Sequence, residues 1–444
     1  MQVLALDVGS SSTRACLYDD RGREVGEAAR RTYEARQGPD GSAELDADEL
    51  VAASRAVLDE GGAEAFDAIG VSCFWHSLVL LDDRDRPLTP VLLWQDRRAA
   101  AQAEELASRL DSSATHARTG CVLHPSYWPA KLAWLRAEQP ETFGAARRIV
   151  SFGDYLFLSL TGELRTTLST ASGTGLLDLR RREWDAELLD VLGVDPALLP
   201  PLGEEPAGTT YPPLGDGACS NLGAGCTTPE RAALMVGTSG ALRVVREGEP
   251  EPRPGLFSYF VDEHRLVEGG AVSDGGNLYA WLERTLRLEP AEPRPPDAHG
   301  LTFLPLLGGE RSPGWNPRAT GAIAGLTFDA DAQDLLQAGL EGVAYRLGEI
   351  ADSLPEIREL VATGHALLAS PQWVQVFADV LDRPVTASGV EEGSARGAAV
   401  HVLERLGVEP EPAPLGEVYE PDAGRTAIYA AARERQRELY ARLF

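Results

Sequence analysis

The strongest constraint on the fold is a strand–turn–strand pattern that occurs twice in the chain. Val3–Val8 and Arg14–Tyr18 are apolar runs joined by a turn of glycine and serines, and Ala233–Val245 repeats this arrangement. Val8-Gly9-Ser10-Ser11 in the first copy matches Val236-Gly237-Thr238-Ser239 in the second. Short apolar runs bounded by such turns are typical of buried strands in hairpins. Two copies, one opening each half, predict two similar domains.

The remaining segments mix the two kinds of secondary structure. Asp46–Leu58 and Ala332–Leu354 have helical spacing, whereas Phe66–Cys73 reads as a buried strand. This mixture favours a layered α/β fold. Pro200–Pro229 is rich in Pro, Gly and Thr and is predicted to be a linker, and a proline-rich loop is expected at Pro290–Pro296. The predicted domains are residues 1–228 and 229–444.

Charge limits the classes of partner. The net charge is −27 over 444 residues, and a nucleic-acid polyanion would be repelled by such a chain. Lys131 is the single lysine among 41 basic residues, the others being arginine. We interpret this composition as a coding bias toward Ala, Arg, Gly and Pro, with adaptation to salt as the alternative. Neither interpretation identifies a function.

Cysteines and hydropathy indicate the compartment. The five cysteines are scattered without the spacing of a metal site and are predicted to be core or loop thiols in a reducing cytosol. The chain does not open with a charged-then-apolar leader, and no apolar run reaches the ~18 residues of a membrane span. We therefore expect a cytoplasmic protein with neither a nucleic-acid nor a membrane partner.

The first turn has the chemistry of a phosphate site. A turn that presents successive N–H groups and hydroxyls can hold phosphate oxygens. Asp7 precedes this turn, where a carboxylate can hold Mg²⁺ beside a polyphosphate, and Arg14 follows it, where a guanidinium can neutralise a γ-phosphate. The alternatives are that Asp7 accepts N–H groups of its own turn and that Arg14 is exposed on an edge strand.

Phosphoryl transfer to an alcohol also needs a base to take the hydroxyl proton. Asp216 is the candidate, because the small residues of LGDGACSNLGAGC (Leu214–Cys226) allow a substrate close approach. From spacing alone, Asp216 would be only a turn residue.

These motifs resemble, in type and in order, those of the FGGY carbohydrate kinases, and the resemblance covers nearly the whole chain. The family's D-x-G-(S/T)-x-(S/T)-x-R element, its G-D pair and its second G-T-S turn all have counterparts here. The matching residues are Asp7, Gly9, Ser10, Ser12 or Thr13, and Arg14; Gly215-Asp216; Gly237-Thr238-Ser239-Gly240; Trp94, Asp96 and Arg98; and the signature region Gly321–Glu341.

The resemblance implies a fold and a reaction. The expected fold is α/β, with two actin-like or ribonuclease H-like domains of the hexokinase/actin-type ATPase superfamily and an interdomain cleft. The expected cofactors are ATP and Mg²⁺, with sugar selection in the first domain and nucleotide binding in the second. Domain closure over the cleft would exclude water. The expected partner is a small sugar or sugar acid, and a homodimer is an assembly that the sequence permits.

The resemblance also implies roles for particular residues. Asp216 is the expected catalytic base and Asp7 the expected metal ligand. The expected substrate-binding residues are Trp75, His76, Asp96, Arg98 and Asp216. The expected cofactor-binding residues are Ser10, Ser11, Ser12, Thr13, Arg14, Gly237, Thr238, Ser239, Gly276, Gly364, His365 and Ala366.

The substrate expected from the resemblance is D-gluconate, phosphorylated on its terminal hydroxyl to 6-phosphogluconate. WHSLVLLDDRDRPLTP (Trp75–Pro90) and RTGCVLHP (Arg118–Pro125) resemble gluconate kinases of the family, with His76 at a substrate-contacting position. The carboxylate of gluconate needs a local cation, for which Arg98, Arg118 or a protonated His76 are candidates. The alternatives are a xylulokinase, a glycerol kinase, and a non-catalytic sugar or nucleotide sensor. The stretch WQDRR (Trp94–Arg98) resembles the corresponding stretch of glycerol kinases.

Two stretches depart from the family pattern. Gly364-His365-Ala366 stands where a run of small residues usually meets adenine, so the effect of His365 on nucleotide preference stays open. HPSYWPAKLAWL (His124–Leu135) brings the bulky Tyr127 and Trp128 into a region expected to shape the sugar pocket.

Overall fold

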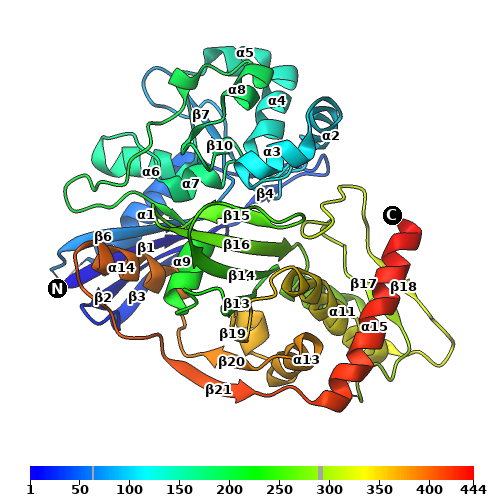
Figure 1. The fold of residues 1–444 in the computed structure, drawn as a ribbon. Helices are drawn as coiled ribbons and strands as arrows, with labels where there is room; N and C mark the ends of the chain where they lie inside the picture. Colours follow the sequence, from blue (N-terminus) through cyan, green and yellow to red (C-terminus); the bar gives the residue numbers. More distant parts are fainter. Residues whose placement is uncertain (63–64, 289–293) are drawn as a thin grey trace. The chain divides into compact units, whose positions relative to one another are not determined.

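The computed structural model describes residues 1–62, 65–288 and 294–444, which group into two compact units (Figure 1). The first unit comprises Met1–Gly225 together with Arg246–Val267 and Glu392–Ala413. The second comprises Cys226–Val245, Glu268–Glu391 and Pro414–Phe444. The domain boundary after residue 228 stays a prediction. Residues 290–293 of the predicted proline-rich loop lie outside the described residues.

The first unit is built on a five-stranded sheet of order β12-β6-β1-β2-β3. Strand β1 (Gln2–Val8) is central, antiparallel to β2 (Ser12–Asp19) and parallel to β6 (Ala68–Cys73). The hairpin β1–β2 is the one predicted from the apolar runs. Strand β12 (Leu214–Gly215) continues the sheet parallel to β6, and β3 (Glu24–Thr32) closes the other edge, antiparallel to β2.

The further elements of the first unit surround this sheet or lie beside it. Its other strands are β4 (Arg36–Gln37), β5 (Ala43–Leu45), β7 (Val79–Leu81), β8 (Val91–Leu92), β9 (Arg148–Val150), β10 (Leu177–Asp178), β11 (Glu183–Trp184) and β15 (Phe257–Phe260). Its helices are α1 (Ala47–Gly61), α2 (Ala100–Arg109), α3 (Ser112–Thr119), α4 (Trp128–Glu138), α5 (Pro140–Ala145), α6 (Phe152–Thr161), α7 (Leu168–Ser172), α8 (Ala186–Leu192), α9 (Asp216–Gly223) and α14 (Gly393–Arg405), with a 3₁₀ turn at Pro196–Leu198.

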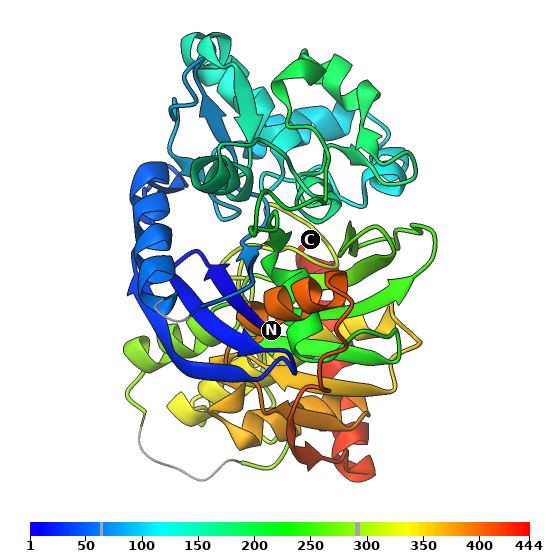
Figure 2. The ribbon, with the colours of Figure 1, turned by 90° about the vertical axis from the view of Figure 1, so that its left-hand side faces the viewer.

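The two faces of β1 are covered by helices from opposite ends of the sequence, because successive side chains of a strand point to opposite faces. Leu4 and Leu6 pack in one apolar cluster with Leu50 of α1, which lies beside the strands in Figure 2. Val3 and Ala5 pack in another cluster with Ala398 of α14. The sheet is therefore buried on both sides, which explains why β1 reads as an almost continuous apolar run.

Glycines allow α9 and α14 to approach closely under the sheet. A Cβ at Gly223 would lie 1.8 Å from the Gly393 carbonyl oxygen, and one at Gly397 would lie 1.8 Å from the Cys219 carbonyl oxygen. Gly70 of β6 meets the Ala398 backbone in the same way, at 2.6 Å. The bare backbones bring the start of α9, which carries Asp216, against a helix from the C-terminal part of the chain.

The linker prediction for Pro200–Pro229 is wrong over most of its length. This stretch contains β12 and α9, and Leu214, Ala218, Cys219 and Leu222 are buried in the first unit. The proline and glycine content that suggested a linker instead serves the tight turns and close helix packing around Asp216. The five cysteines are free and buried, as expected of core thiols.

The second unit repeats the arrangement of the first. Its sheet has the order β16-β14-β13-β19-β20-β21, with β15 as a further strand beyond β16. Strand β13 (Arg231–Val236) is antiparallel to β14 (Gly240–Glu247) and parallel to β19 (Glu359–Thr363), as β1 is to β2 and β6. Strand β20 (Val385–Ser388) then continues parallel to β19, as β12 does to β6. The prediction of two similar domains from the paired hairpins is confirmed.

The remaining elements of the second unit lie on its sheet and at its edge. They are the strands β16 (Arg265–Val272), β17 (Thr302–Leu304), β18 (Ala322–Ala324) and β21 (Leu415–Tyr419), and the helices α10 (Gly276–Thr285), α11 (Ala332–Asp352), α12 (His365–Leu368), α13 (Pro371–Leu381) and α15 (Ala423–Leu443). None of the helices in the described part of the chain combines the length and apolar character that crossing a bilayer needs.

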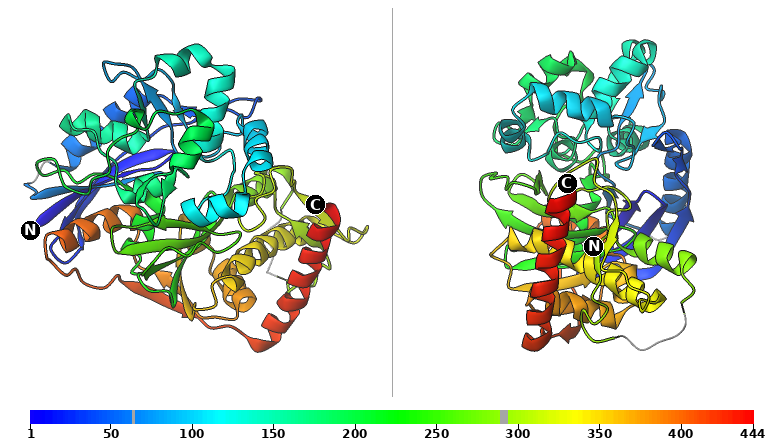
Figure 3. Two further views of the ribbon diagram at one scale, coloured as in Figure 1. Left: turned by 45° about the horizontal axis from the view of Figure 1, so that its top comes forward. Right: turned by 90° about the vertical axis from the view of Figure 1, so that its right-hand side faces the viewer.

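Helix α15 runs along the second unit (Figure 3) and is joined to α11 by a buried carboxylate. Glu341 of α11 is fully buried and accepts hydrogen bonds from Tyr345 at 3.0 Å, Tyr429 at 3.2 Å and Gln337 at 2.8 Å. The imidazole Nε2 of His299 lies 3.0 Å from the same carboxylate. Because these donors occupy both carboxylate oxygens, Glu341 acts as an internal hydrogen-bond centre for α11, α15 and the loop before β17.

The glycine contact between α9 and α14 yields a stability prediction. Gly397→Ala places a methyl group inside the van der Waals radius of the Cys219 carbonyl, so we expect the free energy of unfolding to fall by roughly 1–3 kcal/mol or more. Urea denaturation followed by circular dichroism measures the change. Gly144→Ala in α5, where an added Cβ meets nothing within 4 Å, is the control and should be neutral or stabilising. Equal stability of the two variants would contradict the packing argument.

Candidate functional site

Three parallel strands of the first unit end side by side and present the residues singled out in the sequence. In the register of the sheet, Asp7 pairs with Ser72 and Val8 with Cys73, while Gly215 pairs with Cys73 from the other side. The chain then continues into the Gly9 turn, into Trp75-His76 and into Asp216. The carboxyl ends of parallel strands are the usual place for a binding site in an α/β fold.

The turn between β1 and β2 is held from within, so its serines face outward. The Gly9 N–H donates to the Ser12 carbonyl at 2.9 Å, and the Tyr33 hydroxyl donates to the Gly9 carbonyl at 2.5 Å. Ser10 and Ser12 are half-buried and Ser11 is exposed, whereas Thr13 is buried and donates to the Asp7 carbonyl at 3.2 Å. Three of the four predicted hydroxyls are thus at the surface of the turn, and Thr13 braces it from inside.

Asp7 is a buried carboxylate with two polar partners. Ser72 donates to it at 2.7 Å, and the Arg14 guanidinium lies 3.0 Å away. Burial raises the pKa of Asp7, and Arg14 and Ser72 oppose that rise. Arg14 is also ion-paired with Glu392 at the start of α14. The guanidinium therefore neutralises two carboxylates of the first unit.

Asp7 beside this turn is the type of ligand that binds Mg²⁺ in nucleotide sites. Magnesium is commonly bound through one or two carboxylates, water and the phosphates of the substrate. Asp7 supplies the carboxylate, and the Ser10–Ser12 turn supplies hydroxyls next to it. The residues present fit such an ion, with a divalent cation offsetting the cost of ionising a buried acid.

Asp216 begins helix α9 directly after β12. Its carboxylate accepts the Gly217 N–H at 2.8 Å, and its carbonyl lies 3.3 Å from the Ser394 hydroxyl, which donates to it. The preceding residue has to be glycine, because a Cβ at Gly215 would lie 1.8 Å from the Trp75 indole. Asp216 is partly exposed, so the base predicted from the sequence is accessible in the first unit and adjoins the predicted sugar residue Trp75.

Trp75 and His76 belong to an aromatic cluster with Tyr127 and Tyr259. The Trp75 and Tyr259 rings are 4.9 Å apart, and the His76 ring lies 4.9 Å from Tyr127 and 5.7 Å from Tyr259, all edge-to-face. The two tyrosine hydroxyls are 2.6 Å apart. A small cavity of about 10 Å³, room for about one water molecule, lies against Trp75 and His76 and is lined further by Cys73 and Thr174.

The cluster fixes the orientation of His76. Its Nδ1 lies 2.5 Å from the Gly173 carbonyl oxygen. A carbonyl only accepts hydrogen bonds, so Nδ1 carries the proton and donates. In the neutral ring the Nε2 is then an acceptor, and in the protonated ring it is a donor.

The other predicted substrate residues are engaged with each other. Asp96 is buried and accepts from the Arg98 guanidinium, and Arg98 also pairs with Glu44 at 2.6 Å and stacks 4.4 Å from the Trp134 ring centroid. Arg118, an expected cation for gluconate, pairs with Asp185 at 2.8 Å. These arginines balance neighbouring acids of the first unit.

In the second unit, four of the predicted nucleotide residues gather around Gly237. The Gly276 N–H donates to the Gly237 carbonyl at 2.8 Å, and a Cβ at Gly276 would lie 2.6 Å from that oxygen and 2.8 Å from the Ala366 Cβ. Gly364 has a φ of +89° and lies against the Val236 carbonyl. The Asn277 N–H donates to the Thr238 carbonyl at 3.1 Å. The hairpin turn, the start of α10 and the end of β19 thus form one cradle of nearly bare backbone.

Ser239 and His365 are two further predicted nucleotide residues at this cradle. Ser239 lies in the turn itself, and its backbone is packed against Gly275. His365 opens the short helix α12, and its side chain is exposed. The imidazole is therefore directed to solvent in the second unit.

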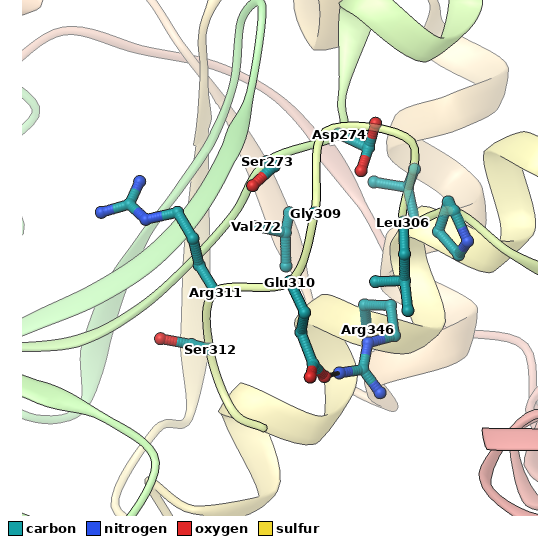
Figure 4. A pocket seen from close by; sticks show the side chains of 11 residues that line it. Val272, Ser273, Asp274, Leu306, Gly309, Glu310, Arg311, Ser312 and Arg346 are labelled. Atoms are coloured by element: carbon teal, nitrogen blue, oxygen red, sulfur yellow. Dashed lines mark hydrogen bonds and ion pairs between the residues drawn. The ribbon is translucent and has the colours of Figure 1, made fainter. Parts of the chain in front are cut away.

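Next to the cradle lies a narrow, closely packed pocket (Figure 4). Asp274 and Ser273 lie at one end, and the Glu310–Arg346 ion pair lies at the other (Figure 4). Asp274 accepts the Gly308 N–H at 3.1 Å, and burial raises the pKa of its carboxyl to about 7. A carboxylic acid that is partly protonated near neutral pH thus lies two residues before Gly276.

Family comparison agrees with this geometry. Residues 2–229 match the N-terminal domain of the FGGY family of carbohydrate kinases, and residues 232–402 match its C-terminal domain. The chain belongs to the FGGY family of carbohydrate kinases. As an FGGY carbohydrate kinase it is a phosphotransferase with an alcohol acceptor, and the predicted two-domain fold of this family is confirmed.

Relatives of more than one specificity are similarly close. A gluconokinase of Bacillus subtilis (strain 168) is 28% identical over 451 residues, covering 91% of this chain and 88% of the relative. A xylulose kinase of Escherichia coli (strain K12) is 29% identical over 486 residues, covering 99% of both. A ligand-bound xylulose kinase structure from Lactobacillus acidophilus superimposes with a TM-score of 0.92 at 28% identity, covering 100% of this chain and 98% of that one.

Several residues of this FGGY kinase site were not predicted from the sequence. Tyr259 and Glu392 reach the first unit from segments far along the chain, and no local pattern marks them. Ser72 could have been found, because a parallel pairing of β1 with β6 places it beside Asp7. Lys131 was noted for its rarity only, although its position inside an apolar helix could have signalled burial.

The raised pKa of Asp274 predicts a pH-dependent stability difference. The folded protein holds this proton up to about pH 7, whereas the ordinary value is 3.8. The contribution of Asp274 to stability is therefore full at low pH and is lost as the pH rises from about 4 to about 7. Asp274→Asn keeps an acceptor for Gly308 and removes the titration.

We expect the Asn variant to gain stability relative to the parent as the pH increases across this window. Urea unfolding between pH 4.5 and 8, at intervals of about half a unit, measures the difference. The exposed Asp329→Asn is the control and should show a flat difference. A flat difference for Asp274→Asn as well would show that its carboxyl titrates normally.

Proposed function

We propose that this FGGY kinase transfers the γ-phosphate of ATP to the terminal hydroxyl of a small sugar acid, converting D-gluconate to 6-phosphogluconate. The observation that carries the proposal is the common edge of β1, β6 and β12, where the Gly9 turn, Trp75-His76 and Asp216 adjoin. A phosphate-binding turn, a polar–aromatic wall and a carboxylate are the parts that sugar phosphorylation needs.

Asp216 is assigned as the general base. Its carboxylate lies at the start of α9, is partly exposed, and accepts the Gly217 N–H at 2.8 Å. It would take the proton of the terminal hydroxyl, C6 in gluconate, while the oxygen attacks the γ-phosphorus in line. The rigid β12–α9 junction, held by Gly215 against Trp75, keeps this carboxylate in place.

Nucleotide binding is assigned to the cradle of the second unit. The N–H groups and hydroxyls of Gly237-Thr238-Ser239 suit phosphate oxygens, and the bare backbone of Gly276 and Gly364 leaves room for a nucleoside. Asp7 and the serine turn would hold Mg²⁺ in the first unit. When bound, that ion would supply charge neutralisation for the phosphates.

Gluconate is proposed as the substrate because the His76 imidazole, at the position where the family resemblance implies sugar contact, is a group that can carry a positive charge. Lys131, the only lysine, donates to the His76 carbonyl at 2.7 Å and thereby holds the segment that carries this ring. In a chain of net charge −27, a local cationic group favours a carboxylate-bearing substrate. A protonated His76 would present Nε2 as a donor to that carboxylate.

Xylulose is the second candidate substrate, favoured by the 29% identity to a xylulose kinase over 99% of both chains. A neutral His76 would accept a sugar hydroxyl at Nε2, which a ketose can supply as well as an acid. Glycerol phosphorylation and a non-catalytic sugar sensor are the other outcomes that an activity panel separates.

Replacing the base tests the proposed mechanism. Asp216→Asn is nearly isosteric but cannot accept the proton, so we expect kcat to fall at least about 10³-fold while ATP binding stays within twofold. Coupled ADP release measures turnover, and titration calorimetry measures ATP affinity. Ser394→Ala, which removes only a contact to the Asp216 carbonyl, is the control for local packing. Near-normal turnover of Asp216→Asn would remove this residue from the role.

Substrate choice is tested with a panel of D-gluconate, D-xylulose, glycerol and their close analogues under the same assay. We expect the highest kcat/KM with gluconate, and loss of that preference in His76→Ala. A highest kcat/KM with xylulose would select the second candidate. Tight sugar binding without ADP release would identify a sensor.

A further inference from the structure

The only lysine of the chain lies inside the first unit. Lys131 belongs to α4 and is 1% exposed. Its amine donates to the His76 carbonyl at 2.7 Å, and the Leu92 carbonyl lies 3.5 Å away. Both acceptors are main-chain groups of neighbouring segments, so the lysine ties α4 to the loop that carries His76.

His76 has a backbone conformation that needs such support. Its φ is +67°, in the left-handed region that residues with a Cβ seldom adopt. The ring is fixed by the Nδ1 contact to Gly173, and the carbonyl is fixed by Lys131. Strained backbone persists at a binding site only where surrounding contacts determine it.

The composition indicates that an arginine would not serve at this position. Everywhere else in the chain basic residues are arginine. The amine is a compact group that fits between two carbonyls, whereas a guanidinium is a wider, planar fork. The Lys131 side chain is itself 1% exposed, so a larger group there would have to displace its neighbours.

The charged side chains that act on the amine, Asp96 and Arg98, lie on one loop between β8 and α2. Burial lowers the pKa of Lys131 to about 7; Asp96 opposes this effect and Arg98 adds to it. Arg98 is itself paired with Asp96 and Glu44. The amine also contacts His76, but through the main-chain carbonyl of that residue. The His76 imidazole is the titratable group that this residue adds.

We propose that Lys131 is a positioning residue for sugar selection, whose amine holds the His76 carbonyl and thereby keeps the imidazole in the orientation that contacts the substrate. This inference rests on the proposed function, in which His76 contacts the sugar. Lys131 does not touch the substrate and acts only through His76.

A double-mutant cycle tests this role. Lys131→Met keeps the length of the side chain and removes the donor, so we expect the KM for gluconate to rise roughly tenfold or more with the KM for ATP within twofold. In a His76→Ala background, Lys131→Met should then have no further effect on the sugar KM, because the imidazole that Lys131 is proposed to position is gone. An unchanged sugar KM, or an equal rise in both backgrounds, would overturn the inference.

A matched control separates positioning from general destabilisation. Leu132→Ala alters the next residue of α4, which packs in the apolar cluster with Leu78 and Trp128. It should lower the melting temperature while leaving the sugar KM within twofold. If Leu132→Ala raises the sugar KM as much as Lys131→Met does, the effect is loss of packing and the inference fails.

A second measurement uses the wild-type protein and does not depend on a variant that folds. Selective ¹³C-lysine labelling gives one side-chain Cε signal, because Lys131 is the sole lysine. Saturating gluconate should shift this signal, and ATP alone should not. No shift under conditions where calorimetry shows that gluconate binds would overturn the inference. No binding and no phosphorylation of any sugar would instead contradict the proposed function.

Discussion

The pairing of one central strand with an antiparallel neighbour on one side and a parallel neighbour on the other organises both units. In the first unit β1 has β2 and β6, and in the second β13 has β14 and β19. The antiparallel partner follows through a short turn, the turn for which we propose phosphate binding. The parallel partner ends at the same edge, so whatever follows it adjoins that loop. The positions of the predicted site residues in both hairpins depend on this strand pairing.

Burial of charge is the second recurring feature. Asp7, Glu341 and Lys131 are each at most 3% exposed, and each has polar partners on neighbouring elements. An unpaired charge in such a place would cost several kcal/mol, so these groups hold their neighbours in defined positions. Asp7 joins β1 to β6 through Ser72, Glu341 joins α11 to α15, and Lys131 joins α4 to the His76 loop. In this acidic protein, the buried carboxylates and the single amine order the site as well as the core.

Much of the fold and part of the site could be predicted from the sequence. The paired hairpins were found because apolar runs and Gly-Ser turns are local signals, and the helices α1 and α11 were recognised by their spacing. The linker over Pro200–Pro229 was wrong, because proline and glycine mark close backbone packing as readily as exposed chain. Tyr259 and Glu392 were missed because their neighbours are more than a hundred residues away in sequence. No periodicity records such contacts.

The sequence by itself determined the duplicated strand–turn–strand units and the family, and it predicts the order of the proposed phosphate turn, base and nucleotide-binding residues. These depend on residue type and short-range spacing, which the chain carries without being folded. Only the tertiary structure decided that Arg14 is shared between Asp7 and Glu392, that Trp75 requires a glycine at 215, and that the lone lysine supports His76. The physical reason is that pairing of buried charges and close packing depend on distances between segments, and folding alone sets these distances.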